Sequence, residues 1–151
     1  MLKRISGFFG IFLVFLGIMM IIPLIVALIY GEHSCVRAFL YGISVALIPG
    51  IIILLIRNKN AISEERLKLR YSYFVVSLAW LIASSISAIP FVIQGCIPNY
   101  IDAFFEMCSG YSTTGATILQ NVEVVPKSLL FWRAQTQWLG GMGIIVFVVL
   151  P

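Results

Sequence analysis

The stretch of sequence that decides the fold is FFEMCSGYSTTGAT, residues 104–117. It holds a glycine-flanked run of hydroxyl residues and lies between two long apolar segments. In membrane hydrocarbon, irregular backbone is tolerated only where it is buried in protein or lines a water-filled cavity. A ring of carbonyl oxygens is one way in which proteins hold a dehydrated alkali cation. The run therefore predicts a loop at membrane depth whose backbone oxygens select a cation.

The composition is that of an integral membrane protein. The chain has 151 residues, of which 61% are hydrophobic and only 11% are charged, and its mean hydropathy is +1.06. Soluble domains usually contain about 25% charged residues. The net charge of +4 does not indicate a nucleic-acid partner, because the basic residues lie in short segments between predicted helices. We therefore expect membrane lipid, and no nucleic acid, around this chain.

Four apolar segments are long enough to cross a membrane. A helix rises about 1.5 Å per residue and must span about 30 Å, so each crossing needs about twenty apolar residues. The predicted crossings are residues 5–30, 36–56, 71–93 and 128 onward. The first is longer than the core of a signal peptide and is not followed by a small-residue cleavage site. Pro23, Pro49 and Pro90 lie late in their segments, where they can kink or end a helix.

Between the last two crossings lies an apolar segment that is too short to span, residues 101–110. It follows Asn99, which is a favoured helix-capping residue, and it ends at Gly110, which favours a helix stop. Ten helical residues reach only about 15 Å, half of the hydrocarbon thickness. The pattern predicts a re-entrant pore helix whose negative C-terminal end favours a cation. The hydroxyl-rich filter run, residues 112–117, then returns the chain outward.

The basic residues predict the orientation in the membrane. The N-terminus carries Lys3 and Arg4, and residues 57–70 hold five more basic residues. Arg37, Lys127 and Arg133 are the basic residues of the opposite segments. Because cytoplasmic loops carry the excess of Lys and Arg, we expect the N-terminus and the basic loop at 58–70 to lie in the cytoplasm.

The candidate filter consists of Thr113, Thr114, Gly115 and Ala116, which would offer main-chain oxygens to the ion. Thr113 or Thr117 could add a hydroxyl oxygen. Gly115 is needed if the backbone enters a region of φ and ψ that is closed to residues with a Cβ. The alternative is a polar loop that only interrupts a helix near the membrane interface.

Four further residues are secondary candidates. Gly140 and Gly141 either let the last helix approach a neighbour closely or act as a bend. Arg133 either faces protein or water inside the membrane or extends to the outer interface. Glu106, inside the short helix, either raises the local cation concentration or bonds to the loop backbone.

No catalytic constellation is present in the sequence. The chain has no HExxH, GxSxG or GxGxxG pattern, and its single histidine is not paired with a nucleophilic cysteine. The three cysteines have no metal-ligand spacing, and whether Cys35 and Cys96 pair is not decided by the sequence. We therefore expect no catalytic or cofactor-binding residue, no prosthetic group and a transport role rather than an enzyme.

Two sequence blocks resemble a known family. They are residues 104–117 and FWRAQTQWLGGMGII, residues 131–145. At this separation they resemble the Trk/Ktr/HKT superfamily of potassium transporters, in particular its TrkH-like membrane subunits. The resemblance implies an all-α integral membrane fold with four transmembrane helices, a re-entrant pore helix and a filter loop. It implies an extra helix pair at 1–57, the basic loop at 58–70 and a first helix–pore loop–helix repeat at 71–151, in a prokaryotic plasma membrane. It implies transported potassium held at Thr113, Thr114, Gly115 and Ala116, chiefly by the oxygens of Thr113 and Thr114.

The resemblance also implies partners, namely a cytosolic nucleotide-binding regulatory subunit of the TrkA/KtrA type and a homodimer of full-length pore subunits. The family builds its pore from four repeats on one chain, whereas this sequence contains one. We therefore expect an N-terminal portion of a longer protein and favour this over a homotetramer of short chains. Two competing functions stay open: a sodium-coupled or less selective cation transporter of the same superfamily, and a non-conducting membrane scaffold fragment.

Overall fold

The computed structural model describes residues 2–56 and 69–149, with side chains described for residues 6–56 and 74–143. These residues form α-helices, one short 3₁₀ helix and no strand. The helices are α1 (Leu2–Met19), α2 (Ile21–Ile29), α3 (His33–Ile56), α4 (Leu69–Gln94), α5 (Tyr100–Tyr111), η2 (Val122–Val124) and α6 (Lys127–Val149). The predicted all-α fold is confirmed, and the helix bounds lie within a few residues of the predicted ones.

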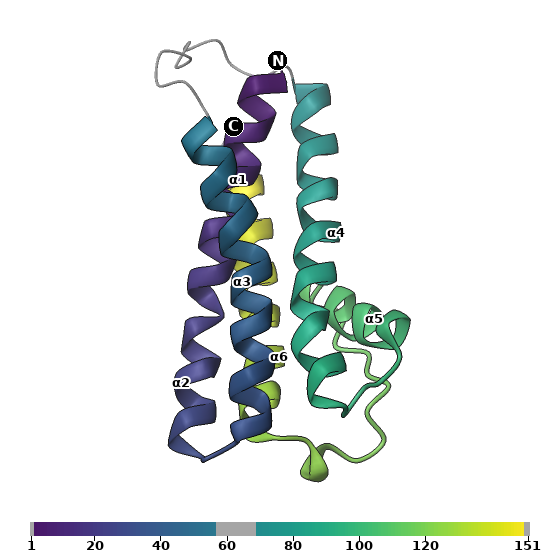
Figure 1. Ribbon diagram of the computed structural model, residues 1–151. Helices are drawn as coiled ribbons and strands as arrows, with labels where there is room; N and C mark the ends of the chain where they lie inside the picture. Colours follow the sequence, from purple (N-terminus) through teal and green to yellow (C-terminus); the bar gives the residue numbers. More distant parts are fainter. Residues whose placement is uncertain (1, 57–68, 150–151) are drawn as a thin grey trace.

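Three helical stretches of the described chain are long and apolar enough to cross a membrane: Ser6–Ile29, His33–Ile56 and Phe74–Gln94. The helix α6 has 23 residues and runs alongside them (Figure 1). The helix α5 has 12 residues, so it measures only about 18 Å and is too short to cross. The start of α1 and the end of α6 lie at the same end of the molecule (Figure 1). This arrangement matches the predicted four crossings.

The first crossing consists of α1 and α2, which meet at Met20, three residues before Pro23, the residue at which the sequence allowed a kink or a helix end. Pro23 explains the break, because a proline has no amide hydrogen and its ring clashes with the carbonyl four residues earlier. That carbonyl belongs to Met19. It accepts a hydrogen bond from the Gln135 amide nitrogen at 3.0 Å. A side chain of α6 thus replaces the missing backbone donor. Pro49 and Pro90 end neither α3 nor α4.

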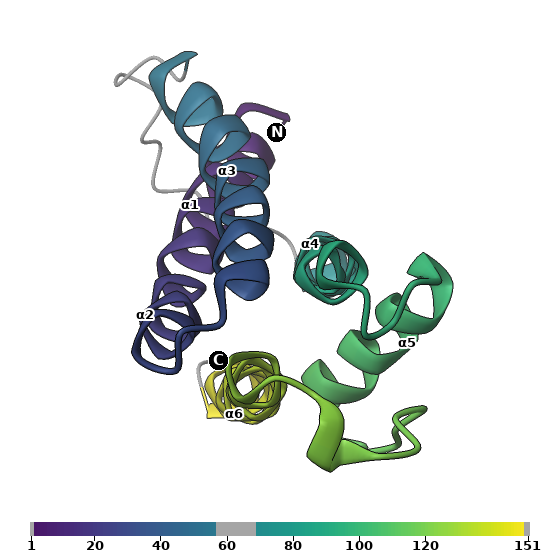
Figure 2. The ribbon, with the colours of Figure 1, turned by 60° about the horizontal axis from the view of Figure 1, so that its bottom comes forward.

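The helices α1 and α3 pack closely because glycines lie between them. A Cβ at Gly17 would lie 2.7 Å from the Leu47 side chain, and one at Gly50 would lie 3.0 Å from Val14. Small residues at such positions let membrane helices approach one another. The N-terminal helices therefore form one packed unit. That unit lies on the opposite side of α4 and α6 from α5 (Figure 2).

The turn between α2 and α3 caps the start of α6. The Glu32 carboxylate accepts hydrogen bonds from the amides of Lys127 at 2.8 Å and Ser128 at 3.2 Å, and from the Ser128 hydroxyl. The Lys127 ammonium lies 4.4 Å from the centroid of the Tyr30 ring. Burial raises the pKa of Glu32, but the hydrogen bonds from Ser128 and Lys127 outweigh it, so the pKa lies below its ordinary value. The N-terminal unit is thereby attached to the first turn of α6.

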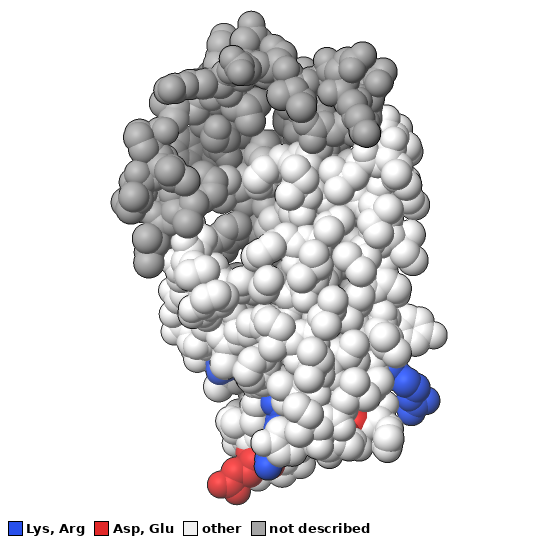
Figure 3. Space-filling view, turned by 90° about the vertical axis from the view of Figure 1, so that its left-hand side faces the viewer, with Lys and Arg blue, Asp and Glu red and all other residues white. Residues whose placement is uncertain are grey.

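The charged side chains that Figure 3 shows gather toward the end that carries the α2–α3 turn, with an uncharged surface next to them. Such a surface is expected of helices that face lipid. The predicted basic loop lies largely outside the described residues, as do the side chains of Lys3 and Arg4. Cys35, Cys96 and Cys108 are free thiols.

Candidate functional site

The helix α5 holds the predicted pore loop beside α6. Its first turn is capped by Asn99, whose side-chain oxygen accepts a hydrogen bond from the Ile101 amide at 3.1 Å. At its other end the Ser112 amide donates to the Cys108 carbonyl at 2.9 Å. The predicted cap is therefore confirmed, and the predicted helix end at Gly110 lies one residue before the observed one.

The backbone amides that follow α5 turn back toward its last turn. The amides of Thr114 and Gly115 donate to the Ser109 carbonyl at 3.1 and 3.5 Å. In a trans peptide unit, the carbonyl of one residue points opposite to the amide of the next, and the described residues contain no cis peptide. The carbonyl oxygens of Thr113 and Thr114 therefore point away from α5, on a loop whose residues from 112 to 118 are exposed.

Two residues of this loop have left-handed backbone. Gly115 has φ +76°, as expected for a position that excludes a Cβ-bearing residue. Thr113 has φ +58°, which is a genuine outlier for a β-branched residue. A backbone state of this kind costs about 1–3 kcal/mol and persists only where its surroundings impose it. The hydrogen bond from the Thr113 amide to the Gly110 carbonyl, at 3.0 Å, is one such restraint.

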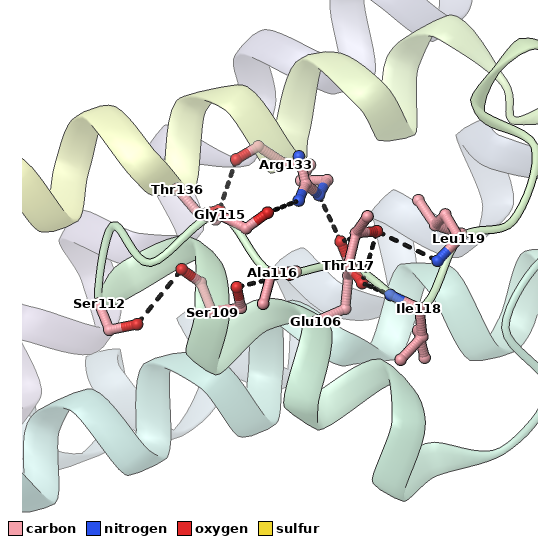
Figure 4. Close-up of polar contacts among 10 residues, drawn as sticks. All are labelled: Glu106, Ser109, Ser112, Gly115, Ala116, Thr117, Ile118, Leu119, Arg133 and Thr136. Atoms are coloured by element: carbon pink, nitrogen blue, oxygen red, sulfur yellow. Dashed lines mark hydrogen bonds and ion pairs between the residues drawn. The ribbon is translucent and has the colours of Figure 1, made fainter.

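Glu106 is fully buried and forms an ion pair with Arg133, which projects from α6 (Figure 4). The same carboxylate accepts hydrogen bonds from the Thr117 hydroxyl at 2.9 Å and the Ile118 amide at 3.0 Å. A buried carboxylate is stable only when it is paired and hydrogen-bonded. Of the two roles open to Glu106, the structure supports binding of the loop backbone. The Glu106 carboxylate holds the outgoing limb of the loop, residues 116–118, against α5.

Two of the four candidate filter residues, Gly115 and Ala116, have main-chain carbonyls that accept hydrogen bonds from protein side chains. The Arg133 guanidinium donates to the Gly115 carbonyl at 3.3 Å, and the Ser109 hydroxyl donates to the Ala116 carbonyl at 2.6 Å (Figure 4). Among the described residues, none donates to the carbonyl oxygens of Thr113 and Thr114. The four predicted filter residues thus fall into two pairs with different backbone surroundings. The contacts of Arg133 are with protein inside the site and not with the outer interface alone.

The helix α6 approaches the end of α5 very closely. A Cβ at Gly140 would lie 2.0 Å from the Tyr111 carbonyl oxygen, and one at Gly110 would lie 2.5 Å from the Thr136 hydroxyl. A Cβ at Gly141 would lie 3.6 Å from Thr113, which is ordinary contact. Since α6 is continuous from Lys127 to Val149, the role of Gly140 is close approach and not a bend. Only Gly140, of the two predicted glycines, is required by this contact.

Behind α5, a buried network joins three helices. The Tyr111 hydroxyl lies 2.9 Å from the Ser87 hydroxyl, and the Trp132 indole donates to the Ser87 carbonyl at 3.2 Å. Ser87 and Trp132 are fully buried. This network holds the residue that immediately precedes the loop against α4 and α6.

Sequence reasoning did not single out Ser109 or Ser87 as site residues. A signal for Ser109 was available, because it lies three residues after Glu106 and therefore on the same face of a helix. Ser87 offered no such signal, since its partners come from two other helices.

No group of three or more His, Cys, Asp or Glu side chains that could hold a metal ion occurs among the described residues. The donors that the loop offers are main-chain carbonyls and hydroxyls. Oxygens of this kind suit a weakly bound alkali cation and not a transition metal.

Comparison with known proteins supports the resemblance drawn from the two sequence blocks. The family model of TrkH, described as a cation transport protein, matches residues 37–151. An uncharacterized cation transporter of Methanocaldococcus jannaschii is 38% identical over 135 residues, which cover 89% of this chain and 27% of that protein. The Trk system potassium uptake protein TrkH of Escherichia coli K12 is 39% identical over 149 residues, covering 97% of this chain and 30% of that protein.

The crystal structure of the potassium transporter TrkH from Vibrio parahaemolyticus has a similar fold. It matches with a TM-score of 0.87 and 34% sequence identity, over 99% of this chain and 31% of that one. The chain thus spans about a third of the length of the relatives that it matches.

Proposed function

The chain belongs to the TrkH family of cation transport proteins, and on that premise we propose that it contributes one filter segment to a potassium uptake pathway across a membrane. The observation that carries the proposal is the orientation of two peptide units. The amides of Thr114 and Gly115 bond to the Ser109 carbonyl, which turns the oxygens of Thr113 and Thr114 toward the open side of the loop. Two adjacent oxygens that face one way are what a carbonyl-lined site needs.

The site is electrostatically suited to a cation. The C-terminal end of α5 carries partial negative charge next to the loop. The positive charge of Arg133 is opposed by the Glu106 carboxylate, so this guanidinium does not stand as an uncompensated charge beside the loop oxygens. The names of the relatives, potassium uptake proteins and a cation transporter, favour potassium as the ion.

A single loop does not surround an ion, so the proposed pathway requires further segments of the same kind. We assign residues 1–57 to an extra helix pair, 58–70 to a basic cytoplasmic loop and 71–151 to the first helix–pore loop–helix repeat. The proposal includes a cytoplasmic N-terminus in the plasma membrane, a homodimer of complete pore subunits and a cytosolic nucleotide-binding regulatory subunit. Sodium coupling or weaker selectivity is the alternative within transport.

A non-conducting scaffold is the alternative from another class. It is favoured by the contacts of the Gly115 and Ala116 carbonyls with protein donors, which are typical of a packed loop. The two readings differ at Gly115, because a filter depends on its left-handed backbone and a scaffold needs only a stable fold.

The test is Gly115→Ser in the complete gene product, expressed in cells without other potassium uptake. No atom lies within 4 Å of a Cβ placed at Gly115, so the substitution acts through φ and not through a clash. We expect potassium uptake to collapse. Gly95→Ser is the matched control, since Gly95 also has positive φ, at +94°, and open surroundings. Normal uptake by a well-expressed Gly115→Ser protein would rule out the filter.

A further inference from the structure

Ser109 makes two opposite kinds of contact with the loop. Its carbonyl accepts the amides of Thr114 and Gly115, at 3.1 and 3.5 Å. Its hydroxyl donates to the carbonyl of Ala116, at 2.6 Å. The Ser109 residue is only 6% exposed, so the loop does not share this hydroxyl with bulk water. One buried residue therefore binds amide hydrogens of the loop at residues 114 and 115 and a carbonyl oxygen of the loop at residue 116, so the peptide units on the two sides point in opposite directions.

The direction in which the carbonyl oxygens point reverses at Gly115. Before it, the Thr113 and Thr114 oxygens point away from α5; after it, the Ala116 oxygen points back to Ser109. The Thr117 amide shares a peptide unit with the Ala116 carbonyl and so points away from Ser109. An amide hydrogen is partially positive and is no ligand for a cation. The Gly115 carbonyl, between those of Thr114 and Ala116, accepts a hydrogen bond from Arg133 at 3.3 Å. Among the described residues, the main-chain oxygens of the candidate filter without a protein donor therefore end at Thr114.

We propose that Ser109 is a positioning residue that ends the cation-ligating part of the loop at Thr114 and thereby sets potassium affinity and selectivity over sodium. The proposal rests on the proposed function. Its physical basis is preorganisation: oxygens held in place bind an ion without first being ordered. Without the hydroxyl, the outgoing limb loses its tether at Ala116, while the main-chain contacts of Thr114 and Gly115 remain.

The test compares Ser109→Ala, Ser109→Thr and Ser44→Ala in the complete gene product. Ser44 is the matched control, because its hydroxyl donates to a main-chain carbonyl, that of Tyr41 at 2.7 Å, within α3 and far from the loop. The readouts are KM for potassium, inhibition of uptake by sodium, maximal rate, and melting temperature in potassium and in sodium.

We expect Ser109→Ala to raise KM for potassium roughly three- to tenfold, as the loss of one hydrogen bond would, and to increase inhibition by sodium. Maximal rate and melting temperature in sodium should change little. Ser109→Thr, which keeps the hydroxyl, should restore KM, and Ser44→Ala should match the parent protein. If the parent protein transports potassium and Ser109→Ala leaves KM and sodium inhibition unchanged, this inference is overturned and the proposed function stands. A parent protein that is neither stabilised by potassium nor transports it overturns the proposed function and this inference together.

Discussion

The two faces of α6 meet their neighbours in different ways. The contacts toward α5 and its loop are those of Arg133, Thr136 and Gly140. The contacts toward the N-terminal helices are those of Ser128, Trp132 and Gln135. The first face combines an ion pair with the closest backbone approach among the glycines of the described chain. The second combines a helix cap, an aromatic contact and an amide hydrogen bond.

Both faces nevertheless supply a side-chain hydrogen bond to a main-chain carbonyl of a neighbouring segment. Pro23 leaves the Met19 carbonyl without a backbone donor, and the loop leaves the Gly115 carbonyl without one. In each case a side chain of α6 supplies the donor, Gln135 on one face and Arg133 on the other. Side chains of a neighbouring helix can thus satisfy backbone groups that an irregular segment leaves free, as is common in membrane proteins. The difference is that Arg133 is charged and therefore needs Glu106 as well.

The largest expected difference between the two faces comes from removing the positive charge on the first face. Arg133→Met leaves the Glu106 carboxylate buried and unpaired, which typically costs about 3–5 kcal/mol. We expect a large fall in the melting temperature of the purified protein and a loss of uptake. Arg37→Met is the control, because Arg37 is exposed and surface changes usually stay within about 0.5 kcal/mol. Adding Glu106→Gln should recover part of the stability, and equal melting temperatures for the Arg133 and Arg37 variants would contradict the assignment.

The close approach on the first face is tested next by Gly140→Ala. The new methyl group would meet the Tyr111 carbonyl oxygen at 2.0 Å, so backbone must shift, and overpacking of this kind costs about 1–3 kcal/mol. Gly143→Ala is the matched control on the same helix, with nothing within 4 Å of its Cβ. The melting temperatures and uptake rates of the two variants are compared. Equal melting temperatures and uptake rates for Gly140→Ala and Gly143→Ala would show that neither stability nor uptake depends on the close contact of α6 with Tyr111.

On the second face, Gln135→Leu removes the donor to the Met19 carbonyl. We expect a loss of about 1–2 kcal/mol, the scale of one buried hydrogen bond. The loss should be modest, because the Gln135 side-chain oxygen has no partner among the described residues and its removal relieves a second unsatisfied group. Pro23→Ala restores a backbone amide that can donate to Met19. The double variant should therefore be more stable than Gln135→Leu alone, and strictly additive losses in a double-mutant cycle would count against this account.

The smallest expected effect is the pH dependence of the cap at the start of α6. The pKa of Glu32 is lowered in the folded protein, so its contribution is fully present above the ordinary glutamate value of about 4.3. It is lost as pH falls through the lowered pKa. Glu32→Gln should cost about 1 kcal/mol at neutral pH, as for other caps. Melting curves between pH 7 and pH 3 should converge for the parent and the variant at the acid end; a constant gap would exclude the carboxylate as the cause.

Much of the fold was predictable from local patterns. The membrane class, the helical segments and the half-length helix capped by Asn99 follow from apolar lengths and capping residues. The need for a left-handed glycine at position 115 followed from the idea of a carbonyl-lined loop. The sequence allowed a kink or a helix end at Pro23, Pro49 and Pro90 alike, but it did not decide at which of them the helix is interrupted, because a proline in a membrane helix breaks it in one context and is tolerated in another. Pro49 and Pro90 are tolerated within continuous helices.

The sequence by itself determined that this is a helical membrane protein with a short capped helix and a polar loop before its last long helix, since length, hydropathy and capping act over a few residues. Only the tertiary structure decided which carbonyls of that loop face outward and which are held by protein. The deciding contacts join residues far apart in the chain, 27 positions between Glu106 and Arg133 and 116 between Met19 and Gln135. No local pattern specifies such partners, because they are set by how the helices pack.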